Sequence, residues 1–226
     1  MADGYSKSIT CLASSIKHSG RCVAGKDTSG WIRPISNRPD EEISNEERML
    51  EDGTFPDVGD VLQIKFQKHV PKAYQSENHL IDAEHFWVLS GRKSFSELET
   101  MQEFPPDTLW QNGLSSSNGV NDQVPIDAAS RFSSSLVLIR PENLIVKRQF
   151  EGYYTRREKR RASFSFNGEP YTLMCTDPWA ETGSIFLGKK VVSFEDALIC
   201  VSLGEDFHGH AYKLVASIIT RDRIGQ

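Results

Sequence analysis

The sequence has no run of about 18 apolar residues, so it predicts no transmembrane helix. Its start lacks the apolar stretch of a secretory signal peptide, which favours a cytoplasmic location. The four cysteines form no CxxC pair and lie in apolar segments, a pattern typical of buried reduced thiols rather than of a zinc site. Phosphate-loop, dinucleotide-binding, serine-hydrolase and zinc-protease motifs are also absent. We therefore expect a protein without catalytic residues, cofactor, metal or membrane contact.

The chain instead contains short segments in which apolar and polar residues alternate, and this period of two predicts β-strands. Asn167-Gly168 between two alternating segments predicts a tight hairpin turn, because both turn positions need a positive φ. The expected strands are residues 8–16, 21–25, 30–36, 61–70, 161–166, 169–177, 197–203 and 213–219, together with two apolar runs within residues 134–150 that a Pro-Glu-Asn turn divides.

Helical signals are few and short. Residues 92–113 predict a helix that is interrupted at a Pro-Pro pair, with Ser94 and Glu97 at the spacing of a capping box. Residues 193–196 (SFED) predict the capped start of another short helix. Long crossover helices are missing, so the pattern favours small β-barrels over a parallel α/β sheet.

The expected fold class is mainly β, with two tandem OB-like small β-barrels, short helices and long loops. Each half of the 226 residues holds about four expected strands, and OB-like barrels have five. A polar segment rich in Gly, Ser and Asn at 114–125 is the best boundary. This gives a first barrel over residues 1–118, with an acidic insert, and a second over residues 119–226.

Charge is distributed unevenly along the chain, whose net charge is −5. Residues 40–60 hold nine acidic side chains against Arg48 alone, whereas residues 156–161 hold five basic side chains and one acidic one. The overall acidity is therefore a sum of separate patches and does not exclude a polyanionic ligand.

The basic segment and its aromatic neighbours form the first candidate site. Arg and Lys neutralise phosphates and aromatic rings stack on bases, as in single-strand binding surfaces. The alternatives are a solvated charge run that balances the acidic insert, and a docking surface for an acidic protein. The candidate residues are Tyr153, Tyr154, Arg156, Arg157, Lys159, Arg160 and Arg161.

Two smaller groups are further candidates for phosphate or base contacts. The first is Lys17, Arg21, Trp31 and Arg33, for which ordinary packing of Arg on Trp is an equal alternative. The second is Glu77, Asn78 and His79, whose polar groups suit a base edge. Loop structure and a metal site formed by Glu77, His79 and Asp82 are the alternatives for this second group.

Four segments of this sequence together resemble bacterial dual-OB-fold domain proteins, over about residues 8 to 220. The resemblance implies a family from prokaryotic conflict and anti-phage gene neighbourhoods that binds nucleic acid, or a signal derived from it, without catalysis. The residues of the two smaller groups stand in the matching motifs, and so does Lys213. The resemblance therefore implies that all of them are site residues. The segments are ITCLASSIKHSGRCVAG, GWIRPIS, QSENHLID and CVSLGEDFHGHAYKLVASII.

The resulting hypothesis is a non-catalytic recognition component of a prokaryotic defence system that binds single-stranded DNA or RNA. A groove between the two barrels is the expected position, because ligand sites favour such junctions. Three alternatives stay open: an adaptor or inhibitor that binds an effector protein, a sensor of a small nucleotide, and a metal-dependent nuclease.

Overall fold

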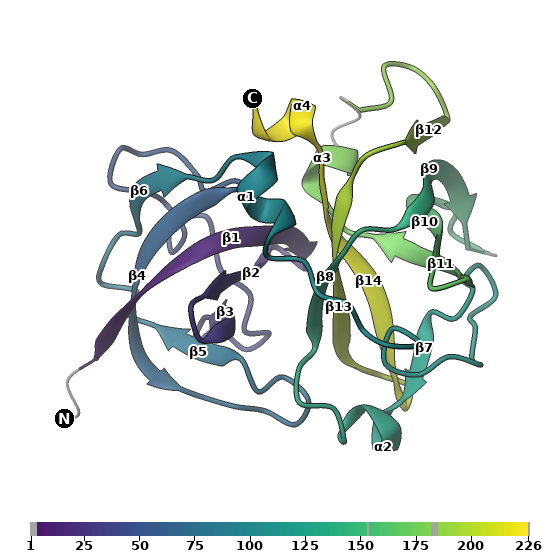
Figure 1. The fold of residues 1–226 in the computed structure, drawn as a ribbon. Coiled ribbons are helices and arrows are strands. Elements are labelled where there is room, and N and C mark those ends of the chain that lie inside the picture. Colours follow the sequence, from purple (N-terminus) through teal and green to yellow (C-terminus); the bar gives the residue numbers. More distant parts are fainter. Residues whose placement is uncertain (1–3, 153, 182–184, 226) are drawn as a thin grey trace.

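Figure 1 shows two β-barrels side by side, in a computed structural model that describes residues 4–152, 154–181 and 185–225. Strands dominate the chain and the helices are short. Among the described residues, no helix has the length and apolar character needed to cross a membrane. The strands of the first sheet lie within residues 5–92 and those of the second within residues 123–219.

The first barrel is a closed ring of five strands in the order β1-β2-β3-β5-β4, and β1 pairs with β4 to close it. β3 and β5 run parallel, whereas the other neighbours in the ring are antiparallel. Leu62, Ile64 and Phe66 alternate with polar residues along β4 and are fully buried. The strands are β1 Tyr5–Lys17, β2 Gly20–Asp27, β3 Gly30–Ile35, β4 Asp60–His69, β5 Asn78–Ile81 and, beside β4, β6 Val88–Arg92.

The second barrel repeats this topology with β9-β10-β11-β14-β13, in which β11 and β14 run parallel. Only Arg140 and Pro141 separate β8 from β9. The two therefore act as one bent strand that pairs with β13 at one end and with β10 at the other, as β1 does with β4 and β2. The strands are β7 Gln123–Pro125, β8 Leu136–Ile139, β9 Glu142–Glu151, β10 Arg157–Phe166, β11 Glu169–Cys175, β12 Val191–Phe194, β13 Leu198–Phe207 and β14 His210–Ile219.

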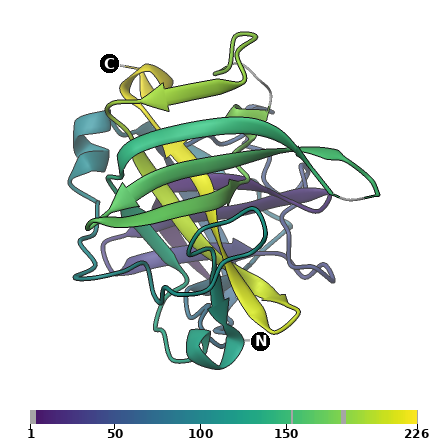
Figure 2. The ribbon, with the colours of Figure 1, turned by 90° about the vertical axis from the view of Figure 1, so that its right-hand side faces the viewer.

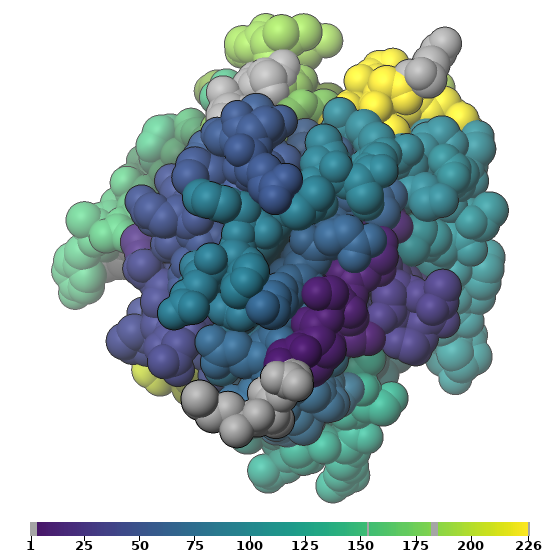
Figure 3. All heavy atoms as spheres, turned by 90° about the vertical axis from the view of Figure 1, so that its left-hand side faces the viewer, coloured from purple at the N-terminus to yellow at the C-terminus, as the bar shows by residue number. Residues whose placement is uncertain are grey.

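These two rings confirm the expected fold class, a mainly β chain with two small OB-like barrels. The expected hairpin turn is also confirmed, since Asn167 and Gly168 have φ values of 51° and 78° between β10 and β11. Figure 3 shows the outer face of the first barrel, which the purple residues of β1 cross beside the blue and teal residues of the strands and loops that follow.

The helices are shorter than the sequence predicts. The expected helix at 92–113 is only α1, Phe95–Glu99, although its capping box of Ser94 and Glu97 is confirmed. The prediction of a helix at SFED (residues 193–196) is wrong, because Val191–Phe194 instead form β12, which extends the sheet beside β9. The remaining helices are α2 Ile126–Ala129, α3 Pro178–Glu181 and α4 Arg221–Ile224.

An apolar cluster joins the two barrels. Leu12 and Ala24 of the first barrel pack with Leu138 and Leu198 of the second, and Leu98 of α1 closes the cluster. All five side chains are buried. Because each barrel covers apolar surface of the other, we expect the two to be stable only together.

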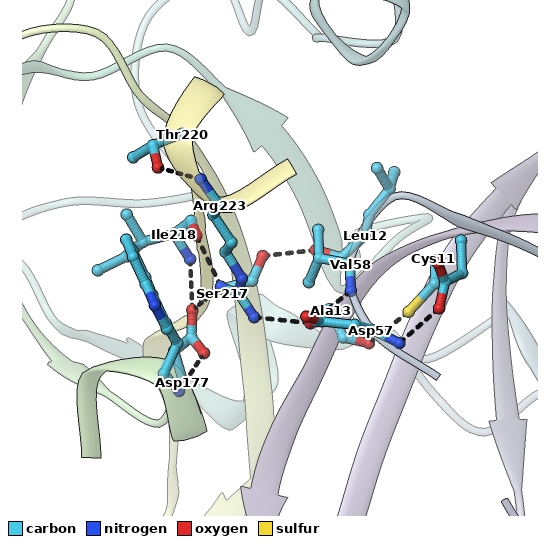
Figure 4. Close-up of polar contacts among 12 residues, drawn as sticks. Cys11, Leu12, Ala13, Asp57, Val58, Asp177, Ser217, Ile218, Thr220 and Arg223 are labelled. Carbon is cyan, nitrogen blue, oxygen red and sulfur yellow. Dashed lines mark hydrogen bonds and ion pairs between the residues drawn. The ribbon is translucent and has the colours of Figure 1, made fainter. Parts of the chain in front are cut away.

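Polar contacts cross the same boundary, as Figure 4 shows. Nη1 of Arg223 in α4 donates to Asp177 Oδ2 at 2.6 Å, and its Nη2 donates to Asp57 Oδ1 in the first barrel at 3.1 Å. The hydroxyl of Ser217 in β14 donates to the carbonyl of Leu12 at 2.5 Å. These bonds fix the relative position of the barrels, and so the shape of every cavity between them.

Candidate nucleic-acid interface

The basic segment 156–161 lies on a hairpin of β9 and β10, which Figure 2 shows extending to one side of the second barrel. Gly152 ends the first arm with a φ of 104°, and a Cβ there would stand 2.5 Å from the carbonyl oxygen of Thr155. Glycine is therefore required for the turn that leads into the basic strand. The candidate Tyr153 lies outside the described residues.

Two of the basic candidates serve to hold this hairpin in place. Arg161 is buried, and its Nε and Nη2 each donate to a carboxylate oxygen of Glu151 at 2.8 Å. These bonds from Arg161 lower the pKa of Glu151. Arg160 pairs with Glu158 at 2.9 Å and donates to the carbonyl of Glu181 at 3.1 Å. Their charges are thus compensated within the protein.

The other basic side chains of the region have no ion-pair partner among the residues that the structure describes. β12 runs along the free side of β9, so the lysines that precede β12 lie beside the hairpin. We refer to the following seven side chains as the basic surface: Lys147, Arg148, Arg156, Arg157, Lys159, Lys189 and Lys190.

Strand register places part of the basic surface on one face. Arg157 and Lys159 of β10 alternate with inward-facing residues, and Lys147 of β9 lies across from Arg161 on the same face. Arg148 faces the other way and stacks over the Phe186 ring at 4.9 Å. The hairpin therefore carries positive charge on both faces, as an arm that a flexible polyanion can wrap.

Aromatic side chains accompany this charge. Phe150 is 59% exposed, with the Arg156 guanidinium 5.7 Å from its ring centroid, and Tyr154 is 93% exposed. Exposed rings next to unpaired cations are the combination that binds single strands, because the rings stack on bases while the cations neutralise phosphates.

Sequence reasoning missed four members of the basic surface: Lys147, Arg148, Lys189 and Lys190. Lys147 and Arg148 stand in the strand that pairs with the basic segment. A hairpin over residues 144–166 would have placed them there, but the sequence predicted only two apolar runs within residues 134–150 and no pairing partner for them. The two lysines before β12 are brought in by a contact between distant segments.

The first N-terminal candidates lie apart from this surface and have partners of their own. Lys17 pairs with Glu205 of the second barrel at 2.9 Å. The indole N–H of Trp31 donates to Glu103 at 3.0 Å, and the Lys26 ammonium lies 4.8 Å from its ring. Both residues thus tie the first barrel to segments that follow it in the chain.

Arg33 and Glu77 form a buried network with Ser135 of the second half. Arg33 Nη2 donates to Ser135 Oγ at 2.7 Å and pairs with Glu77 at 3.4 Å, while the Ser135 hydroxyl donates to Glu77. Arg33 Nε and Glu77 Oε2 are buried without a hydrogen-bond partner among the described residues. A charged network in this position fixes one docking geometry of the two barrels and offers no exposed contact.

Asn78, His79 and Lys213 are buried as well. Asn78 donates to Gln75 at 3.3 Å within its own turn. Lys213 is fully buried on β14, and its ammonium donates to the carbonyl of Gln111 at 2.7 Å. Burial lowers the pKa of Lys213 to about 7. These positions support the framework and do not contribute to the basic surface.

The expected groove between the barrels is present as a cavity of about 190 Å³. Lys17, Arg33 and Gln75 line it from the first barrel, and Ser202 and Glu205 from the second. In OB folds, the second and third strands and two loops form the face that binds oligonucleotides. Cys22 of β2 and Arg33 of β3 line this cavity, so the second barrel lies against part of that face of the first barrel. In the second barrel, the first hairpin carries the exposed side chains of Arg156 and Arg157.

Metal and thiol chemistry find no support in the described part of the chain. No group of three or more His, Cys, Asp or Glu side chains there could hold a metal ion. All four cysteines are unpaired, and burial raises the pKa of Cys11 and of Cys175 to about 12. Such thiols stay protonated at neutral pH and are poor nucleophiles.

Comparison with known proteins agrees with the topology. The sequence model of the dual OB-containing domain matches residues 7–218. A search of curated proteins found no match. The matched range includes both barrels and the hairpin that carries the basic surface.

Proposed function

Because this chain belongs to the dual OB-containing domain family, we propose that it binds single-stranded DNA or RNA, without catalysis, through the basic surface of its second barrel. OB-fold domains are consistent with nucleic-acid binding in general. A role as the recognition component of a cytoplasmic prokaryotic defence system is part of this proposal and is supported only by the resemblance of its motifs.

One observation carries the proposal: the seven cations of the basic surface lack ion-pair partners among the described residues, and they lie on or beside the first hairpin of an OB barrel. The loop between the first and second strands is one that contacts oligonucleotides in this fold. Gly152 and residues 154–156 belong to that loop in the second barrel, and β10 is the second strand of this barrel. Arg156 and Arg157 are exposed there, beside Phe150.

Backbone contacts of this kind position a strand but carry no sequence information. We therefore expect binding with little sequence preference, in which Phe150 and Tyr154 stack on bases that the phosphate contacts bring close. Stacking contributes about 1–3 kcal/mol per base.

The experiment is a salt titration of binding to labelled single-stranded DNA and RNA, followed by fluorescence anisotropy. The variant is Arg156→Gln/Arg157→Gln, which leaves the ion pairs of Arg160 and Arg161 intact. The slope of log K against log salt falls by about 0.7 per phosphate contact, so the variant should lose about 1.4 of slope together with affinity.

Lys68→Gln/Arg131→Gln is the matched control, because both side chains are exposed and its loss of charge is the same. It should bind like the wild type. Equal losses in the two variants, or no binding by the wild type at low salt, would contradict the proposal. Copurification of a protein that occupies the hairpin would instead favour the adaptor.

A further inference from the structure

A second cavity between the barrels, of about 230 Å³, has an excess of positive charge. Ser14, Arg21, Arg48 and Asp57 line it from the first barrel, and Trp179 and Arg223 line it from the second half. None of these residues belongs to the basic surface, so the features of this cavity are independent of the proposed function.

The charges in this cavity are only partly balanced. Arg223 is neutralised by Asp177 at 2.6 Å and also pairs with Asp57 at 3.1 Å. Arg21 and Arg48 have no ion-pair partner among the residues that the structure describes. Two guanidinium groups thus share a cavity whose one lining carboxylate is already engaged.

Arg48 is held in this position by neutral partners. It is 7% exposed, its Nε and Nη2 donate to Asn45 Oδ1 at 3.2 and 3.0 Å, and its guanidinium stacks on Phe55 at 4.3 Å. Burial and then the charge of Arg21 lower its pKa. A guanidinium remains charged under these conditions, so the protein holds a buried cation beside a like charge.

Arg48 lacks a carboxylate ion-pair partner among the described residues although it belongs to the acidic insert. Residues 40–60 contain nine carboxylates, and Arg48 is their one basic residue. The segment packs against the barrel through paired backbone bonds of 2.8 Å between Arg21 and Ile43. Although carboxylates are abundant nearby, the fold directs Arg48 into the cavity without giving it one as an ion-pair partner.

We propose that this cavity binds a phosphate group, held by the guanidinium groups of Arg21 and Arg48 and by the Ser14 hydroxyl. The planar fork of Arg matches phosphate oxygens, and a dianion balances two cations. Drug-sized ligands occupy about 300–1,000 Å³, so a cavity of this size fits the phosphate and not a whole dinucleotide. The group comes from free orthophosphate or from the end of a nucleotide or strand.

Thermal unfolding with millimolar sodium phosphate tests this site, at an ionic strength held constant with sodium chloride. A ligand that binds only the folded state raises Tm with concentration, and calorimetric titration gives its affinity. Arg21→Gln should weaken phosphate binding about tenfold or more, because a charge-assisted bond is lost. Arg21 is partly exposed, so this variant should fold.

Two further variants separate the site from general effects. Arg48→Lys keeps the charge and removes the fork, and it should also weaken binding. Arg131→Gln removes a distant exposed charge and should change nothing. An unchanged phosphate response in Arg21→Gln, or the absence of a response in the wild type, would overturn the proposal.

Additional ligands identify the source of the phosphate. A nucleoside 5′-monophosphate is compared with its nucleoside, and a 5′-phosphorylated oligonucleotide with the 5′-hydroxyl form. Binding of orthophosphate alone points to the free ion, and selective binding of the phosphorylated forms points to a nucleotide or strand end. Arg156→Gln/Arg157→Gln should keep the orthophosphate response, so failure of either proposal leaves the other testable.

Discussion

His79 packs among three rings inside the first barrel, with ring centroids 4.6 Å from His69, 5.4 Å from Phe66 and 5.9 Å from Tyr5. The Tyr5 hydroxyl lies 2.5 Å from its Nδ1. Burial, and then the charge of His69, lower the pKa of His79 to about 4. The ring is therefore neutral at pH 7, and its Nδ1 can accept a hydrogen bond from the Tyr5 hydroxyl.

At pH values between about 6.5 and 4, the unfolded chain protonates this histidine while the folded protein does not. The folded protein should therefore become less stable as the pH falls through this range. NMR titration of the imidazole should give the low pKa directly, and His79→Phe should flatten this part of the stability profile. His208→Asn, at an exposed histidine with a φ of 54°, should not. A measured pKa near 6.5 would contradict the packing.

Single residues also show where sequence reasoning stops. Arg33 was predicted from its neighbour Trp31 two positions away, but its hydrogen-bond partner Ser135 lies 102 residues along the chain. A residue type indicates which groups it can bind, not whether they come from the protein or from a ligand. The basic segment could be predicted as a surface because its decisive neighbours lie in the same hairpin.

At the scale of elements, the β10–β11 turn offers a clean test of backbone strain. Gly168 has a φ of 78°, and a Cβ added there would meet no atom within 4 Å. Gly168→Ala should therefore cost about 1–2 kcal/mol, the left-handed penalty alone, with no steric contribution. Urea unfolding measures it. Gly91→Ala is the control, since its φ is not positive and its Cβ is equally unobstructed. Equal costs at both glycines would contradict this account.

Strands and turns could be predicted where the signal is local, as in this hairpin and in β1, β2 and β3. The strand structure of β8 and β9 could be predicted, but the pairing of the two as one bent strand could not, because β8 pairs with β13 about 60 residues away whereas β9 pairs with the neighbouring β10. The prediction of a helix at SFED was wrong for a related reason. Its capping spacing is a local preference, and pairing of β12 with β9 overrides it.

At the scale of the whole molecule, the closed ring topology explains how two small barrels support one site. The second barrel lies against part of the oligonucleotide face of the first, and the first supports β13 and β14 through the shared apolar cluster. The hairpin of β9 and β10 projects from this pair of barrels with Arg156 and Arg157 exposed. The −5 net charge is compatible with this arrangement because the acidic insert belongs to the other barrel.

This mutual support predicts that the two barrels unfold together, in one transition that coincides by fluorescence and by circular dichroism. Arg223 tests the link, because it joins Asp177 and Asp57 across the boundary. Arg223→Met leaves Asp177 buried without its cation and should cost about 3–5 kcal/mol. The same substitution at Arg221, an exposed neighbour paired with Glu99 and Asp196, should cost at most about 1 kcal/mol. Two separate transitions would show that the barrels are independent. Equal costs for the two variants would show that Arg223 does not link them through a buried ion pair.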